Sequence, residues 1–188
     1  MRFAALLTIA GLALSGCSTV GDALDTPEQN AGPCPNALSL YDAHRVVEFQ
    51  GEAVAYDNVG YTGEILNVGS LCRYVGSDPI VNNMQIRFAF GRGPAAEGMT
   101  HTYHYFVAVT RTDLAVIERQ TFPIEVRFEP GQNRVERVES FDNIVIPRAT
   151  ETTSGANFEI LVGFELSEEQ LEFNRSGQRF RVSAGSGD

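Results

Sequence analysis

From Cys34 onward the chain is dominated by short stretches in which apolar and polar residues alternate. Large apolar residues occupy every second position of residues 84–90 (MQIRFAF) and 124–129 (IEVRFE), a pattern typical of strands with one buried face. Residues 103–109 (YHYFVAV) are apolar on both parities, which is typical of a central strand covered on both faces. The pattern therefore predicts a protein built mainly from β-strands.

Glycine, proline and short polar turns separate the remaining apolar stretches. We expect further strands at residues 45–50, 64–75, 115–121, 134–139, 143–146 and 158–164. The turn at Thr112 and Asp113 makes residues 115–121 the hairpin partner of residues 103–109. Pro123 cannot donate a ladder hydrogen bond, so we expect a bulge, a sheet edge or a switch of strand there.

One helix signal is present near the C-terminal end of the chain. Ser167 and Gln170 have the spacing of a capping box. Glu168 and Glu169 suit the positive end of a helix dipole. Residues 168–174 are therefore expected to form a helix of about two turns.

Many short strands, frequent turns and almost no helix favour an antiparallel β-sandwich of immunoglobulin-like or transthyretin-like topology. A small β-barrel is the alternative. We place the folded domain at residues 34–174, which is long enough to bury a core of its own. Residues 175–188 are expected to be a flexible tail, with an added edge strand around Phe180 and Val182 as the second possibility.

The N-terminal segment differs in character from the rest of the chain. Arg2 precedes an apolar run at residues 3–14, about 12 residues long, whereas a membrane-spanning helix needs roughly 20. Residues 1–16 are therefore expected to be a cleaved secretory signal peptide. Residues 18–33 (STVGDALDTPEQNAGP) are small, polar and acidic, which is typical of a flexible tether.

The end of the signal peptide carries a motif, Leu14-Ser15-Gly16-Cys17. It resembles the lipobox of bacterial lipoproteins, in which small residues separate an aliphatic residue from a cysteine. In that family a diacylglycerol is attached to the cysteine, the preceding peptide is removed, and the new amino terminus is acylated. The resemblance implies lipidation of Cys17, a lipidated tether at residues 17–33 and stable anchoring by several acyl chains. The alternative is an ordinary signal peptide that contains a cysteine.

Two further features extend this resemblance. Ser18, rather than an aspartate, follows the cysteine, and by the sorting rule of Gram-negative lipoproteins this implies the outer membrane, facing the periplasm. The segments YFVAV, FPIEVRF and ILVGFELSEEQLEFNR resemble uncharacterised envelope lipoproteins of alphaproteobacteria. This second likeness implies no particular activity.

The chain contains three cysteines. Assigning Cys17 to lipid leaves Cys34 and Cys72 as an even pair, and the compartment implied by the signal peptide is oxidising. The sequence has no C-x-x-C spacing typical of redox-active dithiols. We therefore predict a structural disulfide between Cys34 and Cys72.

The formal net charge is −10, and removal of Arg2 with the signal peptide makes it −11. Phosphate recognition needs clustered positive charge, so nucleic-acid binding is disfavoured. An acidic body is also repelled by anionic lipid headgroups, so the acyl chains must hold the protein at the membrane.

Candidate chemistry is sparse. Imidazole and thioether groups suggest a copper or zinc site at Met99, His101 and His104. Residues 101 and 104 of one strand point to opposite faces, however, so a shared metal requires a turn near Thr100. These three residues are weak candidates, and we predict no cofactor. A hydrolase is disfavoured because the sequence has no G-x-S-x-G motif and only His44 as a third histidine.

Our first hypothesis is a lipid-anchored, non-enzymatic β-sandwich that serves as an interaction or assembly module of the cell envelope. Its expected partner is another envelope protein, bound through an exposed sheet edge or loop end. Tyr41, Tyr56 and Tyr61 form either an exposed recognition patch or a cover for the end of the core. A periplasmic small-molecule or metal-binding protein is the alternative function, and a hydrolase comes third.

Overall fold

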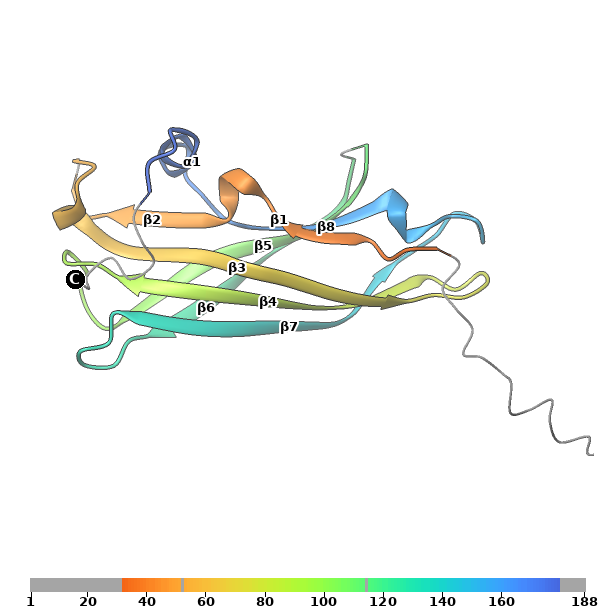
Figure 1. Cartoon of the computed structure of the whole chain (residues 1–188), viewed down its shortest axis with the longest axis horizontal. Coiled ribbons are helices and arrows are strands. Elements are labelled where there is room, and N and C mark those ends of the chain that lie inside the picture. The colour runs from red at the N-terminus through yellow and green to blue at the C-terminus, as the bar shows by residue number, and fades with distance from the viewer. Residues whose placement is uncertain (1–31, 52, 114, 180–188) are drawn as a thin grey trace, which may run out of the picture.

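The computed structural model describes residues 32–51, 53–113 and 115–179. The signal segment, the lipobox with Cys17, and the possible edge strand at Phe180 and Val182 lie outside these residues. Two four-stranded sheets pack face to face and enclose the main hydrophobic core (Figure 1). The prediction of an all-β sandwich with one short helix near the C-terminus is confirmed.

The strand order is β1-β8-β5-β6 in the first sheet and β2-β3-β4-β7 in the second. The first sheet consists of β1 (Asn36–Ser39), β8 (Phe158–Phe164), β5 (Thr100–Arg111) and β6 (Val116–Arg127). The second consists of β2 (Arg45–Phe49), β3 (Val59–Arg73), β4 (Ile80–Arg92) and β7 (Arg134–Ile146). Short 3-10 turns occupy Tyr41–Ala43, Tyr56–Asn58 and Gly155–Asn157, and helix α1 is Glu168–Arg175. Neighbouring strands are antiparallel, except that β1 runs parallel to β8.

Strand β6 crosses Pro123 without a break and joins the strands predicted at 115–121 and 124–129. Pro123 stands opposite His104 of β5, and β6 is the outer strand of its sheet. An edge strand tolerates proline because one row of its backbone donors has no neighbouring strand to meet. Of the outcomes expected at Pro123, the sheet edge is the one found.

Strand β7 likewise joins the stretches predicted at 134–139 and 143–146. Asp142 and Asn143 of β7 oppose the single residue Asn83 of β4, which makes a β-bulge. Asn143 has a φ of 61°, a left-handed conformation that asparagine tolerates better than most residues, and its N–H donates to Asn83 Oδ1 at 3.0 Å. The bulge therefore lets the two predicted strands continue as one.

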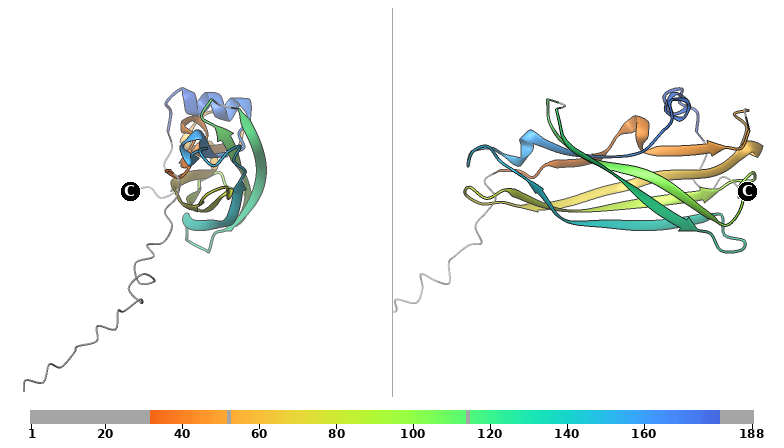
Figure 2. Two further views of the ribbon diagram at one scale, coloured as in Figure 1. Left: turned by 90° about the vertical axis from the view of Figure 1, so that its right-hand side faces the viewer. Right: turned by 180° about the vertical axis from the view of Figure 1, so that it is seen from behind.

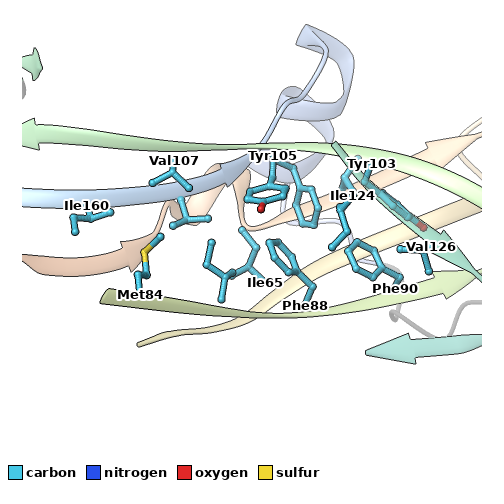
Figure 3. Close-up of a cluster of buried hydrophobic side chains, with 14 of the residues drawn as sticks. Ile65, Met84, Phe88, Phe90, Tyr103, Tyr105, Val107, Ile124, Val126 and Ile160 are labelled. Atoms are coloured by element: carbon cyan, nitrogen blue, oxygen red, sulfur yellow. The ribbon is translucent and has the colours of Figure 1, made fainter. Parts of the chain in front are cut away.

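Aromatic side chains from both sheets meet in the core (Figure 3). Phe88 of β4 is fully buried. Its ring centroid lies 5.7 Å from that of Phe90, 5.0 Å from that of Tyr105 and 5.8 Å from that of Phe164. Because Tyr105 and Phe164 belong to the first sheet, this cluster holds the two layers together.

Helix α1 begins as the capping box predicts. Ser167 Oγ accepts from the Gln170 backbone N–H at 3.2 Å, and the Ser167 N–H donates to Gln170 Oε1 at 2.9 Å. Asn174 Nδ2 donates to the backbone carbonyls of Asp42 and Arg45, at 2.8 and 2.9 Å. The helix is thereby fixed beside the outer edge of β2 (Figure 1).

The predicted disulfide between Cys34 and Cys72 is present, with an S–S distance of 1.97 Å. It joins the chain just before β1 to the last part of β3. Tyr74 reinforces the junction, since its hydroxyl donates to the Pro33 carbonyl at 2.9 Å and accepts from the Gly155 N–H at 3.0 Å. The domain therefore starts at a fixed point, at the end that carries the β3–β4 and β7–β8 connections (Figure 1). We refer to this end of the molecule as the N-terminal end of the sandwich.

Candidate functional site

The two histidines of the weak metal candidate lie on opposite faces of β5. His101 faces the second sheet: its Nε2 atom lies 3.0 Å from Glu48 Oε1, and its ring stacks on Tyr61 with centroids 4.1 Å apart. His104 is exposed on the outer face, and Met99 packs against the main core. The three side chains therefore do not converge on one ion. Within the described residues no group of three or more histidine, cysteine, aspartate or glutamate side chains is placed to hold a metal.

The three tyrosines considered as a recognition patch differ in burial. Tyr61 is 3 % exposed in β3, and its hydroxyl donates to backbone carbonyls that include that of Gly98, at 3.3 Å. Tyr41 and Tyr56 are 70 % and 43 % exposed. His44 bonds through Nδ1 to the Tyr41 carbonyl, within one turn of chain. Tyr61 is thus part of the core, and only the other two tyrosines are at the surface.

A polar cluster on the outer face of the first sheet joins β6 to the segment that leads into α1. Arg119 Nη2 donates to both carboxylate oxygens of Glu165, at 2.7 and 2.8 Å, and Thr121 Oγ1 donates to Oε1 at 2.6 Å. Partial burial by itself would raise the pKa of Glu165. The hydrogen bonds from Thr121 and Arg119 and the charges of Arg119 and His104 outweigh burial and lower this pKa. The side chains of the cluster hydrogen-bond to one another, so the cluster fixes β6 to the segment that leads into α1.

An apolar groove lies between the two sheets, on the side where β6 and β7 form the outer edges. Its cavity volume is about 310 Å³, at the lower end of the range for ligand sites. Val107 and Val109 of β5, Phe122 of β6, and Phe141 and Ile144 of β7 form its apolar walls. We call this hollow the β6–β7 groove.

The groove exists because the two edge strands diverge. β6 runs obliquely to β7 and separates from it toward the β5–β6 hairpin (Figure 2, right). Where the strands are close, Phe122 and Phe141 meet edge to face with centroids 5.0 Å apart, and Tyr105 stacks on Phe122 at 5.6 Å. These three rings close one end of the groove. Val145, which also lines the groove, is 55 % exposed.

One acidic side chain, Glu118, lines the groove, and a second, Glu139, lies on the inner face of β7. Glu118 of β6 stands opposite Val109, so both side chains lie on the inner face of the sheet. Glu139 of β7 stands opposite the fully buried Ile86 and faces the same way. Burial, and after it the negative charge of Glu139, raises the pKa of Tyr105. Neither carboxylate forms an ion pair with another described residue.

A buried amide lies next to the groove wall. Asn82 stands opposite Ile144 in the β4–β7 ladder and is fully buried. Neither its side-chain nitrogen nor its side-chain oxygen has a hydrogen-bond partner among the described residues. An unpaired buried polar group costs about 1–3 kcal/mol. Unpaired buried polar groups are expected mainly at functional sites, and Asn82 adjoins the groove.

A larger hollow of about 660 Å³ lies between β2 and α1. There the helix already meets the free edge of β2, since Gln170 Nε2 donates to the Val47 carbonyl at 3.4 Å. Phe49 and Phe173 also pack against each other edge to face, with centroids 5.4 Å apart. The β6–β7 groove differs from this hollow because it adjoins a strand edge that no described element covers.

Sequence reasoning did not identify the groove, although a signal for it was present. Ile124 and Val126 are buried on the inner face of β6. Glu118 and Gln120 continue the same parity, so residues 118–121 are polar on both faces. A change of pattern within one strand is typical of a strand that leaves the core.

Comparisons of this chain with protein-family models, with curated proteins and with solved structures found no match. In the described part of the chain no helix is both long enough and apolar enough to cross a membrane. The function must therefore be argued from the site itself.

Proposed function

We propose that this protein is a lipid-anchored, non-enzymatic β-sandwich that serves as an interaction or assembly module of the cell envelope. In this proposal Cys17 holds it at the outer membrane, facing the periplasm, and its body binds another envelope protein. The observation that carries the proposal is the first half of β6, which lies beside the β6–β7 groove and which no described element covers. A free edge offers backbone donors and acceptors, and a neighbouring groove offers side-chain pockets, which together suit the addition of a partner's strand.

Exposed apolar side chains support docking at this side. Val116 and Ile117 at the start of β6 are 62 % and 46 % exposed, and Val145 on the groove wall is 55 % exposed. Sheet edges of this kind are usually covered or charged, because they promote association. The apolar start of β6, which no described strand covers, is therefore a candidate contact surface.

The expected anchor is compatible with a partner near the membrane. As a flexible coil, a tether of about 16 residues has a reach of roughly 20 Å. Cys72, Asn82 and Ile144 stand side by side across β3, β4 and β7. The groove wall thus lies in the same row as the disulfide, at the N-terminal end of the sandwich, which the tether would keep close to the membrane.

Replacing Cys17 with serine is expected to release a folded protein from the membrane, because the acidic body has no attraction of its own for anionic lipid. Fractionation of cells that express each full chain measures this. The unsubstituted chain should sediment with membranes and Cys17→Ser should appear in the periplasmic fraction, whereas the control Ser18→Ala should stay membrane-bound. Continued sedimentation of Cys17→Ser would contradict the proposed anchor.

A photo-crosslinking side chain at position 120 should link the protein to a discrete envelope protein in intact cells. Gln120 lies on the wall of the groove, so a strand added to β6 would pass beside it. Position 125 is the matched control, because Glu125 is exposed on the same strand but belongs to the opposite face. Equal crosslinking from both positions, or none from position 120, would argue against a partner at this edge.

A further inference from the structure

We propose that the anchored protein rests on the lipid headgroups of the membrane through the outer face of the β3–β4 hairpin. This inference rests on the lipid anchor of the function proposed above, and it adds a second membrane contact that sets the orientation of the domain. It follows from three properties of this surface: exposed aliphatic side chains, arginines without an ion pair, and a position beside the start of the fold.

The outer face of the hairpin is formed by alternate residues of two paired strands. Leu71 stands opposite Asn83, and Arg73 stands opposite Val81, so both pairs share one face. Asn82, which lies between two of these residues, is fully buried, so the shared face points away from the core. We call it the β3–β4 face, and it lies at the N-terminal end of the sandwich (Figure 1).

Aliphatic side chains of the β3–β4 face are open to solvent. Leu71 is 81 % exposed, the largest fraction among the large hydrophobic side chains of the described residues. Val81 is half-buried on the neighbouring strand. Both line a hollow of about 500 Å³ together with Val75 and Pro79 of the hairpin turn. Exposed apolar surface of this kind marks a contact with a protein or a membrane.

The β3–β4 face is not acidic, although the chain as a whole has a net charge of −10. Residues 65–96 contain three arginines and only one carboxylate, that of Asp78. Arg73 and Arg87 are exposed on this face, and neither forms an ion pair with another described residue. Asp78 in the hairpin turn and Asp142 in the bulge of β7 flank the face. Arginines beside aliphatic side chains suit the boundary between headgroup phosphates and acyl chains.

The chain enters the fold beside this face. Cys34 is joined to Cys72, the residue after Leu71, and their Cα atoms are 5.6 Å apart. The expected anchor, Cys17, lies 15 positions before Gly32, where the described chain begins. A flexible coil of this length has a reach of roughly 20 Å. The tether would therefore keep the β3–β4 face within reach of the bilayer surface.

Lipid suits this face better than a second copy of the chain does. A second copy would bring its own Arg73 and Arg87 to the contact, and like charges that face each other are destabilising. A headgroup phosphate instead has the opposite charge. Because β6 belongs to the other sheet, resting on the β3–β4 face also leaves the free edge of β6 open to a partner protein.

The contact is too small to replace the anchor. Even one myristoyl chain gives only marginal membrane binding, and a few aliphatic side chains bury less apolar surface than such a chain. The β3–β4 face therefore orients an anchored protein but does not hold a free one. Release of Cys17→Ser from the membrane remains the expected result.

The test uses tryptophan fluorescence, because the chain contains no tryptophan and a single introduced one reports only on its own surroundings. Leu71→Trp places the reporter on the β3–β4 face. The matched control Ile117→Trp places it at the same end of the sandwich but on the first sheet, where Ile117 is 46 % exposed. Each lipidated full chain is reconstituted in phosphatidylcholine vesicles whose acyl chains do or do not carry bromine, a short-range quencher.

Bromine should quench the fluorescence of Leu71→Trp by about half and that of Ile117→Trp by less than about a tenth, because only an interfacial side chain comes close to the acyl chains. Adding Arg73→Glu to Leu71→Trp should reduce the quenching about twofold, since a carboxylate is repelled by the phosphates. Adding Arg127→Glu, which changes an exposed arginine of β6, should leave the quenching unchanged.

The outcomes separate this inference from the proposed function. If the chain floats with the vesicles but Leu71→Trp is not quenched, or is quenched no more than Ile117→Trp, the inference fails and the proposed anchor stands. If the chain does not float with the vesicles, the anchor fails and the inference falls with it. A blue shift of Leu71→Trp emission with rising protein concentration, measured without vesicles in the Cys17→Ser background, would make a second copy the occupant and overturn the inference.

Discussion

Replacing Phe88 with alanine is expected to lower the free energy of unfolding by about 3–5 kcal/mol. The ring is fully buried and contacts Phe90, Tyr105 and Phe164, so its removal takes apolar surface out of the core and leaves a cavity between the sheets. A loss of this size is a large share of the total stability of a typical domain. Equilibrium unfolding in urea, followed by circular dichroism, measures the change.

Val138→Ala is the matched control for this experiment. Val138 lies on β7, opposite Arg87 of β4, and is 56 % exposed. Its truncation should change the free energy of unfolding by less than about 0.5 kcal/mol. A comparable loss from both substitutions would mean that the packing between the sheets does not hold the fold as described.

Loss of the Cys34–Cys72 disulfide is expected to lower the free energy of unfolding by about 4 kcal/mol. The two cysteines are separated by 38 positions. The crosslink restricts the unfolded chain by closing a loop of this length, and the chain-entropy model gives roughly this stabilisation. Urea unfolding of the oxidised protein and of Cys34→Ala/Cys72→Ala gives the difference directly.

A reducing agent provides the control for the disulfide. Dithiothreitol should lower the stability of the unsubstituted protein toward that of Cys34→Ala/Cys72→Ala and should leave the double variant unchanged. Equal stability of the oxidised protein and the double variant would show that the crosslink does not restrict the unfolded chain in this way.

Most of the strands could be predicted because their signals are local. The alternation at residues 84–90 lies within β4, and the apolar run at 158–164 coincides with β8. Ser167 and Gln170 likewise marked the start of α1, since capping depends on residues one turn apart. Signals of this kind need no knowledge of the rest of the fold.

Elements that depend on distant partners were missed or divided. β1 is a strand of four residues with little pattern of its own, and it forms because it pairs in parallel with β8. The strand predicted from residue 64 begins at Val59, where pairing with β2 extends it. Pro123 does not divide β6, because β6 is the outer strand of its sheet in the described part of the chain, where no further strand needs the missing N–H.

The β-sandwich class, the helix start and the expected cysteine pair could be inferred without a structure, because periodicity, capping and cysteine count are properties of the chain alone. The positions of β6 and β7 as the outer strands on one side, with Phe122 and Phe141 in contact and the groove beside them, became visible in the folded protein alone. This difference arises because periodicity shows which face of a strand is buried. The order of strands is set instead by pairing and packing between residues far apart in the chain, and the candidate site lies where that order leaves an edge uncovered.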